Sequence, residues 1–333
     1  MQLGVSVIVC CYNSAERLPQ TIKHLALQRV PSHIPWEIIV IDNASTDNTG
    51  VIADQEWNKY SKQVKFRVIK QPVAGLSYAR EKGIENAQYE YMLFCDDDNW
   101  LYNDYISKSY EIMTSDPQIG AVGGCGIFEP EQPAWFEVET HKIAYVNGPQ
   151  TWAKTEHWVY GAGSVYRKSI FITLRKENWR QITTGRLGNK LISGEDVEIC
   201  FMIYLLGYKI ISDDKLLFKH FVPIKRQNIN YILNLHYWQS YTNVLLNSYY
   251  PILNHDERQI EKIINGWYWI TAKTFLKQKV KCFFVKKPLT FKEKINYHAV
   301  LGTFAGLREN RERIIEHHNE LHRILASVLN TIK

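Results

Sequence analysis

Several features that would place this chain in a common protein class are missing from its 333 residues. The first predicted strand is followed by Cys10-Cys11-Tyr12-Asn13-Ser14 and not by a G-x-G-x-x-G turn, which argues against a nucleotide-dependent dehydrogenase. The six cysteines form no C-x-x-C pair, so we expect buried free thiols. No apolar run reaches the roughly 18 residues of a membrane span, and no signal-peptide pattern is present. We therefore expect a cytoplasmic protein.

The net charge differs between the two parts of the chain: it is slightly negative in the first two thirds and positive in the last third. Residues 1–224 carry 23 Lys and Arg against 26 Asp and Glu, whereas residues 225–333 carry 17 against 8. The excess is modest and no recognition module for nucleic acid is visible, so we expect no nucleic-acid partner. The length exceeds one average domain and predicts a full α/β domain with an appended segment.

Buried strands and helices alternate through the first hundred residues. Apolar runs at 5–11, 37–41, 64–69 and 91–95 predict strands, and helical spacing predicts helices at 18–25 and 76–86. This alternation predicts a doubly wound, mostly parallel sheet, which binds ligands at the carboxyl ends of its strands. Asp42 and Asp96–Asp98 follow two of the strands, so we expect two acidic turns to face one crevice.

The second half has weaker periodicity. Strands are predicted at 121–128 and 216–221, and a helix at 195–206, which Gly207 ends. Residues 225–333 are basic and rich in aromatic residues, and we expect them to be helical.

Three adjacent carboxylates, Asp96-Asp97-Asp98, stand at the end of a predicted buried strand. Adjacent carboxylates repel one another, and a cation relieves that repulsion. Mg²⁺ and Mn²⁺ take oxygen ligands and bridge carboxylates to diphosphates. A solvated acidic loop is the alternative for this triplet taken alone.

Six short motifs occur in one order along residues 4–222. They are Val5-Ser6-Val7-Ile8-Val9-Cys10-Cys11-Tyr12-Asn13, Ile39-Val40-Ile41-Asp42-Asn43-Ala44-Ser45-Thr46-Asp47, Gly75-Leu76-Ser77-Tyr78-Ala79-Arg80, Phe94-Cys95-Asp96-Asp97-Asp98, Gly161-Ala162-Gly163 and Gly194-Glu195-Asp196. Together they resemble family 2 glycosyltransferases, inverting enzymes with the GT-A fold. The resemblance implies a catalytic domain at 1–224, with a nucleotide-sugar half at about 1–100 and an acceptor half at about 101–224, before a helical region at 225–333.

The resemblance also implies roles for single residues. Asp96 and Asp98 match the family's D-x-D motif, and His220 matches a second metal ligand, for Mn²⁺ or Mg²⁺. The nucleotide, UDP by resemblance with GDP or dTDP as alternatives, would be bound by residues at the first strand ends and on the helix after Gly75. The residues with this expected role are Tyr12, Asn13, Asp42, Ala44, Arg80, Asp96 and Asp97.

Asp196 matches the family's catalytic base, and a helix N-terminus keeps such a carboxylate ionised. Glu195 and Glu198 are close enough to assist, and the sequence does not exclude an exchange of roles or a simple helix cap. The sugars would contact Gly161, Ala162, Gly163 and Trp158, with Trp135 and Trp152 as further stacking faces. For any one tryptophan, packing in the core is the alternative.

The partners follow from these roles. We expect a nucleotide-sugar donor and a saccharide or lipid-linked saccharide acceptor, with one transfer per encounter, in polysaccharide or glycoconjugate synthesis. The lysine-rich, aromatic segment 273–294 predicts peripheral contact with the inner membrane face. The alternative is that this segment is part of a helical cap on the catalytic domain, which forms a homodimer and leaves the lysines solvated. A non-catalytic or nucleotidyltransferase-like protein that binds nucleotide sugars is the alternative for the whole chain.

Overall fold

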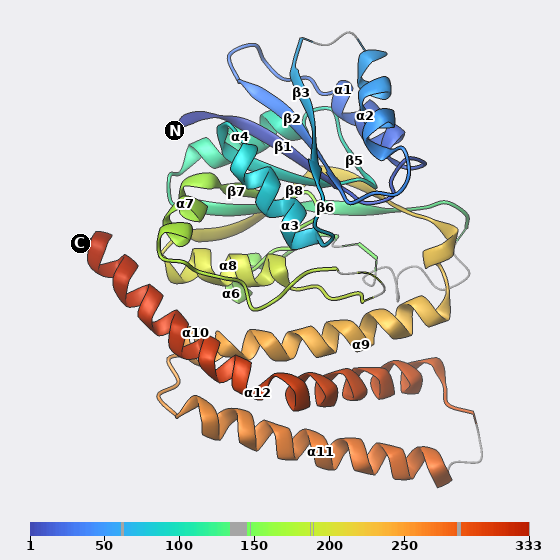
Figure 1. The fold of residues 1–333 in the computed structure, drawn as a ribbon, viewed down its shortest axis with the longest axis vertical. Coiled ribbons are helices and arrows are strands. Elements are labelled where there is room, and N and C mark those ends of the chain that lie inside the picture. The colour runs from blue at the N-terminus through green and yellow to red at the C-terminus, as the bar shows by residue number, and fades with distance from the viewer. Residues whose placement is uncertain are drawn as a thin grey trace.

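The computed structural model describes residues 1–60, 63–133, 145–146, 148–186, 188, 190–284 and 288–332. In these residues a curled mixed sheet is flanked by helices, and a further helical layer lies beyond one side of it (Figure 1). The predicted α/β class, with a helical C-terminal region, is therefore confirmed.

One sheet contains all the named strands, in the order β3-β2-β1-β4-β7-β6-β8-β5. The strands are β1 (Gln2–Cys11), β2 (Trp36–Asn43), β3 (Lys65–Gln71), β4 (Tyr89–Asp96), β5 (Asn99–Leu101), β6 (Ile119–Pro130), β7 (Val165–Arg167) and β8 (Lys209–Val222). The half formed by β3, β2, β1 and β4 is parallel, as predicted, whereas β7 is antiparallel to both of its neighbours. β8 is longer than predicted, because Asp213-Asp214-Lys215 interrupts its apolar pattern without ending the strand.

Helices connect the strands and then continue alone to the C-terminus. The connecting helices are α1 (Leu18–Ala26), α2 (Thr49–Asn58), α3 (Leu76–Asn86), α4 (Tyr105–Ser115), α6 (Ala153–Glu156), α7 (Lys168–Lys176) and α8 (Glu195–Leu205). The later ones are η2 (Ile224–Arg226), α9 (Ile229–Leu245), η3 (Leu246–Ser248), α10 (Tyr250–Leu253), α11 (Ile260–Phe284) and α12 (Phe291–Ile332).

The strand register aligns the acidic turns. Cys11 of β1 lies opposite Asp42 of β2, and Cys10 lies opposite Asp96 of β4. Parallel strands present their carboxyl ends at one edge, so both turns emerge beside the end of β1. The central strands are fully buried, which explains why their apolar runs are continuous and not alternating.

The C-terminal helices belong to the same packed body as the sheet. α9 packs on α12 and α12 on α11, which is the outermost of the three (Figure 1). One buried cluster joins Ile8 and Ile39 of the sheet, Ile199 of α8, and Leu307 and Ile314 of α12. Residues 225–333 therefore share a hydrophobic core with the first part of the chain.

Candidate active site

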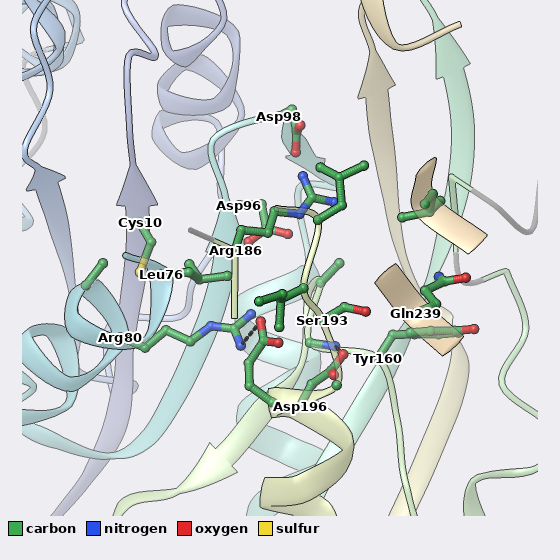
Figure 2. A pocket seen from close by; sticks show the side chains of 18 of the residues that line it. Cys10, Leu76, Arg80, Asp96, Asp98, Tyr160, Arg186, Ser193, Asp196 and Gln239 are labelled. Atoms are coloured by element: carbon green, nitrogen blue, oxygen red, sulfur yellow. Dashed lines mark hydrogen bonds and ion pairs between the residues drawn. The ribbon is translucent and has the colours of Figure 1, made fainter. Parts of the chain in front are cut away.

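A cavity of about 710 Å³ opens at the carboxyl ends of β1 and β4 and reaches α8 and α9. Asp96 and Asp98 lie toward one end of it, Asp196 lies at the start of α8, and Tyr160 and Gln239 lie opposite Arg80 (Figure 2). The predicted site residues that line the cavity are Tyr12, Arg80, Asp96, Asp97, Asp98, Trp158, Gly161, Ala162, Glu195, Asp196 and His220. Its size suits a small-molecule ligand.

The three carboxylates of the acidic turn point in different directions. Asp97 is turned into the protein, where Arg17 donates hydrogen bonds to both of its oxygens over 2.8 and 2.7 Å and Ser14 donates another. The Thr21 hydroxyl also donates to the Asp97 carbonyl oxygen over 2.8 Å. Asp97 therefore anchors the turn against α1, and Asp96 and Asp98 are left to face the cavity.

Strand pairing brings His220 beside Asp98. Asn99 of β5 lies opposite His220 of β8, and the Phe221 N–H donates to the Asp98 carbonyl oxygen over 2.8 Å. The Nε2 atom of His220 is 3.6 Å from one Asp98 oxygen, and Arg226 donates to the other over 2.8 Å.

The pair Asp96 and Asp98 is electrostatically split. Burial, together with the neighbouring Asp98 charge, raises the pKa of Asp96. Burial acts in the same direction on Asp98, but His220, Arg226 and Arg17 outweigh it and hold the pKa of Asp98 below its usual value. The pKa of Asp98 is thus shifted in the direction that favours its ionised form, and the pKa of Asp96 in the opposite direction.

The side chains at this end of the cavity can bind a divalent cation if a bound ligand supplies further oxygen atoms to it. In the part of the chain that the structure describes, no three His, Cys, Asp or Glu side chains converge into a complete metal cage. Asp98, His220 and Asp96 supply two carboxylates and one imidazole at the cavity wall. Mg²⁺ is bound in this way, by one or two carboxylates with substrate phosphates completing its shell.

Backbone donors fix the Asp196 carboxylate at the start of α8. The Gly161 N–H donates to one oxygen over 2.6 Å, and the Val197 N–H donates to the other over 2.9 Å. Gly194 precedes the helix with φ of 94°, a left-handed conformation that favours glycine. The G-E-D motif thus encodes the turn and the carboxylate together.

Glu195 forms a buried ion pair with Arg80. The Arg80 Nη1 atom is 2.9 Å from Glu195 Oε1, and the guanidinium also lies over the ring of Phe94. Burial raises the pKa of Glu195 even though Arg80 opposes the shift, and Glu195 Oε2 is buried with no hydrogen-bond partner among the described residues. Arg80 and Glu195 therefore form one wall of the cavity behind Asp196.

The two glycines of Gly161-Ala162-Gly163 are needed for different structural reasons. A side chain at Gly161 would come within 2.9 Å of an Arg80 nitrogen and 3.1 Å of the Asp196 Cβ. Gly163 has φ of 70° and packs against Tyr105 and Phe218, away from the cavity lining. Close approach at this loop is therefore to the protein's own side chains.

The predicted nucleoside end is formed by loops after β1 and β2. Tyr12 is 53% exposed and lines the cavity. Asn13, Asp42 and Ala44, all within the described residues, do not line it. Asn13 accepts hydrogen bonds from Thr46 and so joins the two loops, whereas Asp42 keeps one buried oxygen with no protein partner in the described part of the chain.

Trp158 packs against two aromatic neighbours at the cavity wall. Its ring centroid lies 5.3 Å from that of Trp152 and 5.1 Å from that of Tyr160. Trp158 and Tyr160 line the cavity and Trp152 does not. Trp135 lies outside the described residues.

Several residues that line the cavity belong to none of the sequence motifs and were not predicted. Among them are Arg186 from the loop before α8, Arg226 from η2, and Tyr231, Gln239 and Asn243 from α9. These residues follow or lie between the recognisable motifs, and only the four-residue spacing along α9 could have indicated a shared face.

Residues 6–175, half of the chain, match the family model described as glycosyl transferase family 2. The chain belongs to glycosyl transferase family 2. Poly-beta-1,6-N-acetyl-D-glucosamine synthase from Staphylococcus epidermidis is 25% identical over 225 residues, 66% of this chain and 50% of that protein. Glucosyl-dolichyl phosphate glucuronosyltransferase from Haloferax volcanii is 22% identical over 265 residues, 77% of this chain and 81% of that protein.

One solved structure has a fold similar to that of this chain. The mannosyltransferase from Pyrobaculum calidifontis, in complex with GDP-Man and Mn²⁺, superposes with a TM-score of 0.51 at 17% identity, over 99% of this chain and 79% of that one. The chain spans about half the length of the Staphylococcus synthase. The likeness to the mannosyltransferase structure shows the fold. In its described residues, no helix combines the length and the apolarity that a membrane crossing requires.

Proposed function

We propose that this chain moves one sugar from a nucleotide-diphosphate donor, with UDP as the expected nucleotide, to an acceptor hydroxyl and inverts the anomeric configuration. The observation that supports this is the common cavity: Asp96 and Asp98 lie toward one end and Asp196 lies further along it. A donor diphosphate beside the first two carboxylates then has its sugar within the space that Asp196 borders.

The proposed reaction is a single displacement. The Asp196 carboxylate accepts the proton of the acceptor hydroxyl while the hydroxyl oxygen bonds to the anomeric carbon. The bond from that carbon to the diphosphate oxygen breaks, and the nucleoside diphosphate leaves with the electron pair. Attack opposite the leaving group inverts the configuration. The Gly161 and Val197 N–H groups orient the carboxylate, and Glu195 assists by holding Arg80.

We assign the metal site to Asp98 and His220, with Asp96 beside them. A bound Mn²⁺ or Mg²⁺ supplies charge neutralisation for the leaving diphosphate. Arg226 supplies positive charge at the same end through its contact with Asp98. The structure of the Pyrobaculum mannosyltransferase contains Mn²⁺, which is consistent with this assignment.

We assign the nucleoside to the exposed ring of Tyr12 and to Asp42, whose unpartnered oxygen can accept a hydrogen bond from a base or ribose. Asn13 and Ala44 shape the loops there. Arg80 lines the cavity between this end and Asp196. The loop Gly161-Ala162-Gly163 and Trp158 border the sugars.

The acceptor is proposed to be a saccharide, free or lipid-linked, in polysaccharide or glycoconjugate synthesis. We propose that residues 1–224 form the catalytic domain and that residues 225–333 form a helical region that completes it. A second copy of the chain, forming a homodimer, is the alternative partner for the exposed face of α11.

The outer face of α11 supports peripheral contact with an anionic membrane. Its inner face packs on α12, with Tyr268 and Phe275 stacked on Phe304. The opposite face exposes four large apolar side chains, each more than half exposed: Trp269, Ile270, Leu276 and Val280. Their spacing of one, six and four residues keeps them on one side of the helix, together with Lys273 and Lys277.

Charge complementarity supports an anionic lipid surface as the partner of that face. Residues 262–292 contain eight lysines and no Asp or Glu. Basic amphipathic helices bind anionic lipid, each basic residue contributing about 1 kcal/mol near the surface. Residues 285–287 of the predicted segment 273–294 lie outside the described residues. We therefore propose the outer face of α11, which includes the first half of the segment, as the membrane contact at the inner membrane face.

The donor assignment is tested by calorimetric titration of the whole chain with UDP-glucose, UDP-galactose, UDP-N-acetylglucosamine and GDP-mannose, with Mn²⁺ or with chelator. One nucleotide sugar should bind with Mn²⁺, and chelator or Asp98→Asn should weaken it at least tenfold. Asp104→Asn, at an exposed ion pair with Lys108, is the matched control and should bind normally. If no nucleotide sugar binds with Mn²⁺ present, the proposed function is wrong.

A further inference from the structure

One face of α9 forms a wall of the cavity. Tyr231, Leu235, Gln239 and Asn243 follow one another at four-residue intervals, and all four line the cavity. Residues four apart lie on the same side of a helix, so this is a single stripe. α9 lies beyond residues 6–175, so the family match assigns these side chains no role.

The stripe has the chemistry of a sugar-binding surface. Gln239 is half-buried, Asn243 is exposed, and in the described residues neither side-chain amide has a hydrogen-bond partner. The ring of Tyr231 is stacked on Tyr145 with a centroid distance of 5.9 Å and an interplanar angle of 6°. Amides pair with hydroxyls in both directions, and aromatic rings pack against the apolar faces of sugars.

The charge of α9 separates this wall from the rest of the cavity. Its 17 residues contain no Lys, Arg, Asp or Glu. The charged side chains of the cavity in the described residues all come from other elements, and Arg226 is the one that acts on Tyr231 of the stripe. They are Arg17, Arg80, Asp96, Asp97, Asp98, Arg186, Glu195, Asp196 and Arg226. A neutral polar ligand therefore suits the α9 wall better than a phosphate or a carboxylate does.

The position of the stripe relative to the base decides which sugar it would meet. Gln239 and Tyr160 lie on the side of Asp196 away from Arg80 and Cys10, and Ser193 and Asp196 lie between the two sides (Figure 2). A donor bound at Asp96 and Asp98 leaves this second side open. An acceptor hydroxyl that reaches Asp196 from the α9 side therefore approaches it from the side opposite to Arg80.

α12 holds α9 at a fixed distance from the cavity. A side chain at Gly302 would overlap the Tyr237 carbonyl oxygen, and one at Gly306 would come within 2.7 Å of the Tyr241 carbonyl oxygen. Asn310 also donates to the Tyr241 hydroxyl over 3.0 Å. The two helices thus pack backbone against backbone, and the stripe is a preformed surface.

We propose that the stripe Tyr231, Leu235, Gln239 and Asn243 is the acceptor subsite and that it takes a neutral saccharide, whose hydroxyls pair with the Gln239 and Asn243 amides. The subsite rests on the proposed function. It also gives residues 225–333 a direct part in the reaction, beyond the packing of a cap. Removal of one amide leaves an acceptor hydroxyl without its hydrogen-bond partner in the complex, which costs affinity and raises KM for the acceptor.

The test compares two reactions of the whole chain. With Mn²⁺ and the nucleotide sugar that binds best, nucleotide release is measured first in water alone and then against rising concentrations of methyl α- and β-glycosides of glucose, galactose and N-acetylglucosamine. In water alone only hydrolysis of the donor occurs, which reports donor binding and the metal end. Added glycosides report the acceptor side.

Gln239→Ala and Asn243→Ala should each raise KM for the best glycoside about tenfold and leave hydrolysis and donor KM within twofold. Asn234→Ala, an exposed position of α9 outside the cavity lining, should change neither. The inference is overturned if the wild-type chain hydrolyses donor but no glycoside accelerates release, if KM is unchanged in both variants, or if hydrolysis falls in parallel with transfer. A chain that neither binds nor hydrolyses any donor overturns the proposed function instead.

Discussion

The backbone N–H of Gly161 donates a 2.6 Å hydrogen bond to the Asp196 carboxylate. This contact joins two motifs that are 35 residues apart, and it leaves no room for a side chain at 161 between Arg80 and Asp196. The position of the proposed base is therefore set by the same loop that borders the sugars. Arg80, on the other side of the loop, is in turn held by Glu195.

The buried pair of Arg80 and Glu195 predicts a large loss of stability when one partner is removed. Arg80→Met leaves Glu195 buried without its cation and should lower the free energy of unfolding by about 3 kcal/mol. Arg175→Met removes an exposed arginine that pairs with Glu81 and Glu85 and should cost less than about 1 kcal/mol. Urea denaturation of both variants measures the difference. Equal losses would mean that the Arg80 pair is not structurally important.

The exposed face of α11 predicts binding to anionic vesicles. Wild-type chain should co-sediment with phosphatidylserine-containing vesicles at low salt, and 0.5 M NaCl should release it because the lysine contribution is screened. Trp269→Glu with Ile270→Glu should abolish binding, whereas Val51→Glu, at an equally exposed apolar position on α2, should not. Failure of the wild-type chain to bind these vesicles removes the membrane proposal and leaves the transferase proposal intact.

The crossing of α9 and α12 predicts opposite effects for two helical glycines. Gly302→Ala places a methyl group against the Tyr237 carbonyl and should destabilise the chain by about 1–3 kcal/mol. Gly266→Ala, in α11 with open space around it, should be neutral or stabilise by up to about 1 kcal/mol. Thermal unfolding of the two variants tests this. A Gly302→Ala variant as stable as Gly266→Ala would contradict the close helix contact.

A buried carboxyl group between α8 and α12 predicts a pH-dependent stability. Burial raises the pKa of Glu198 from 4.5 to about 7, although Thr183, Ile182 and Tyr249 all donate hydrogen bonds to it. The folded state thus keeps a proton that the unfolded chain releases, and this stabilisation is fully present below pH 4.5 and is lost as the pH rises through about 7. Burial lowers the pKa of the neighbouring His317 to about 4, so its contribution is lost only on acidification.

Glu198→Gln isolates that contribution, since the variant retains His317 and cannot titrate at 198. Relative to the variant, the wild-type chain should lose about 3 kcal/mol of unfolding free energy between pH 4.5 and pH 7.5. Urea unfolding across this range measures the difference. A constant difference would show that the pKa of Glu198 is not raised in the folded chain.

The sequence was sufficient for the parallel half of the sheet and for the acidic turns. Continuous apolar runs fixed β1, β2 and β4, and their common carboxyl edge brought Asp96 and Asp98 to a cavity. Helices at Tyr105–Ser115 and Lys168–Lys176 were not predicted: each is short, and neither has an N-cap side chain that forms a capping hydrogen bond.

Other parts of the site depend on tertiary contacts that local patterns do not contain. Asp97 resembles its two neighbours in sequence, but its carboxylate is bound by Arg17, 80 residues earlier, and by Ser14. α9 is apolar or aromatic on several sides, so the stripe that faces the cavity is selected by the packing of α12 at Gly302 and Gly306. Arg226 reaches Asp98 across 128 residues.

The most direct test of the account is the turnover of Asp196→Asn. The amide keeps the shape of the carboxylate but cannot take the acceptor's proton, so kcat should fall at least about 100-fold. Donor affinity in Mn²⁺ should stay within threefold, because Asp96, Asp98 and His220 are unchanged. The wild-type product should carry the inverted anomeric configuration by NMR. An Asp196→Asn chain that turns over within threefold of wild type, while binding donor equally well, would contradict the assignment of Asp196 as the base.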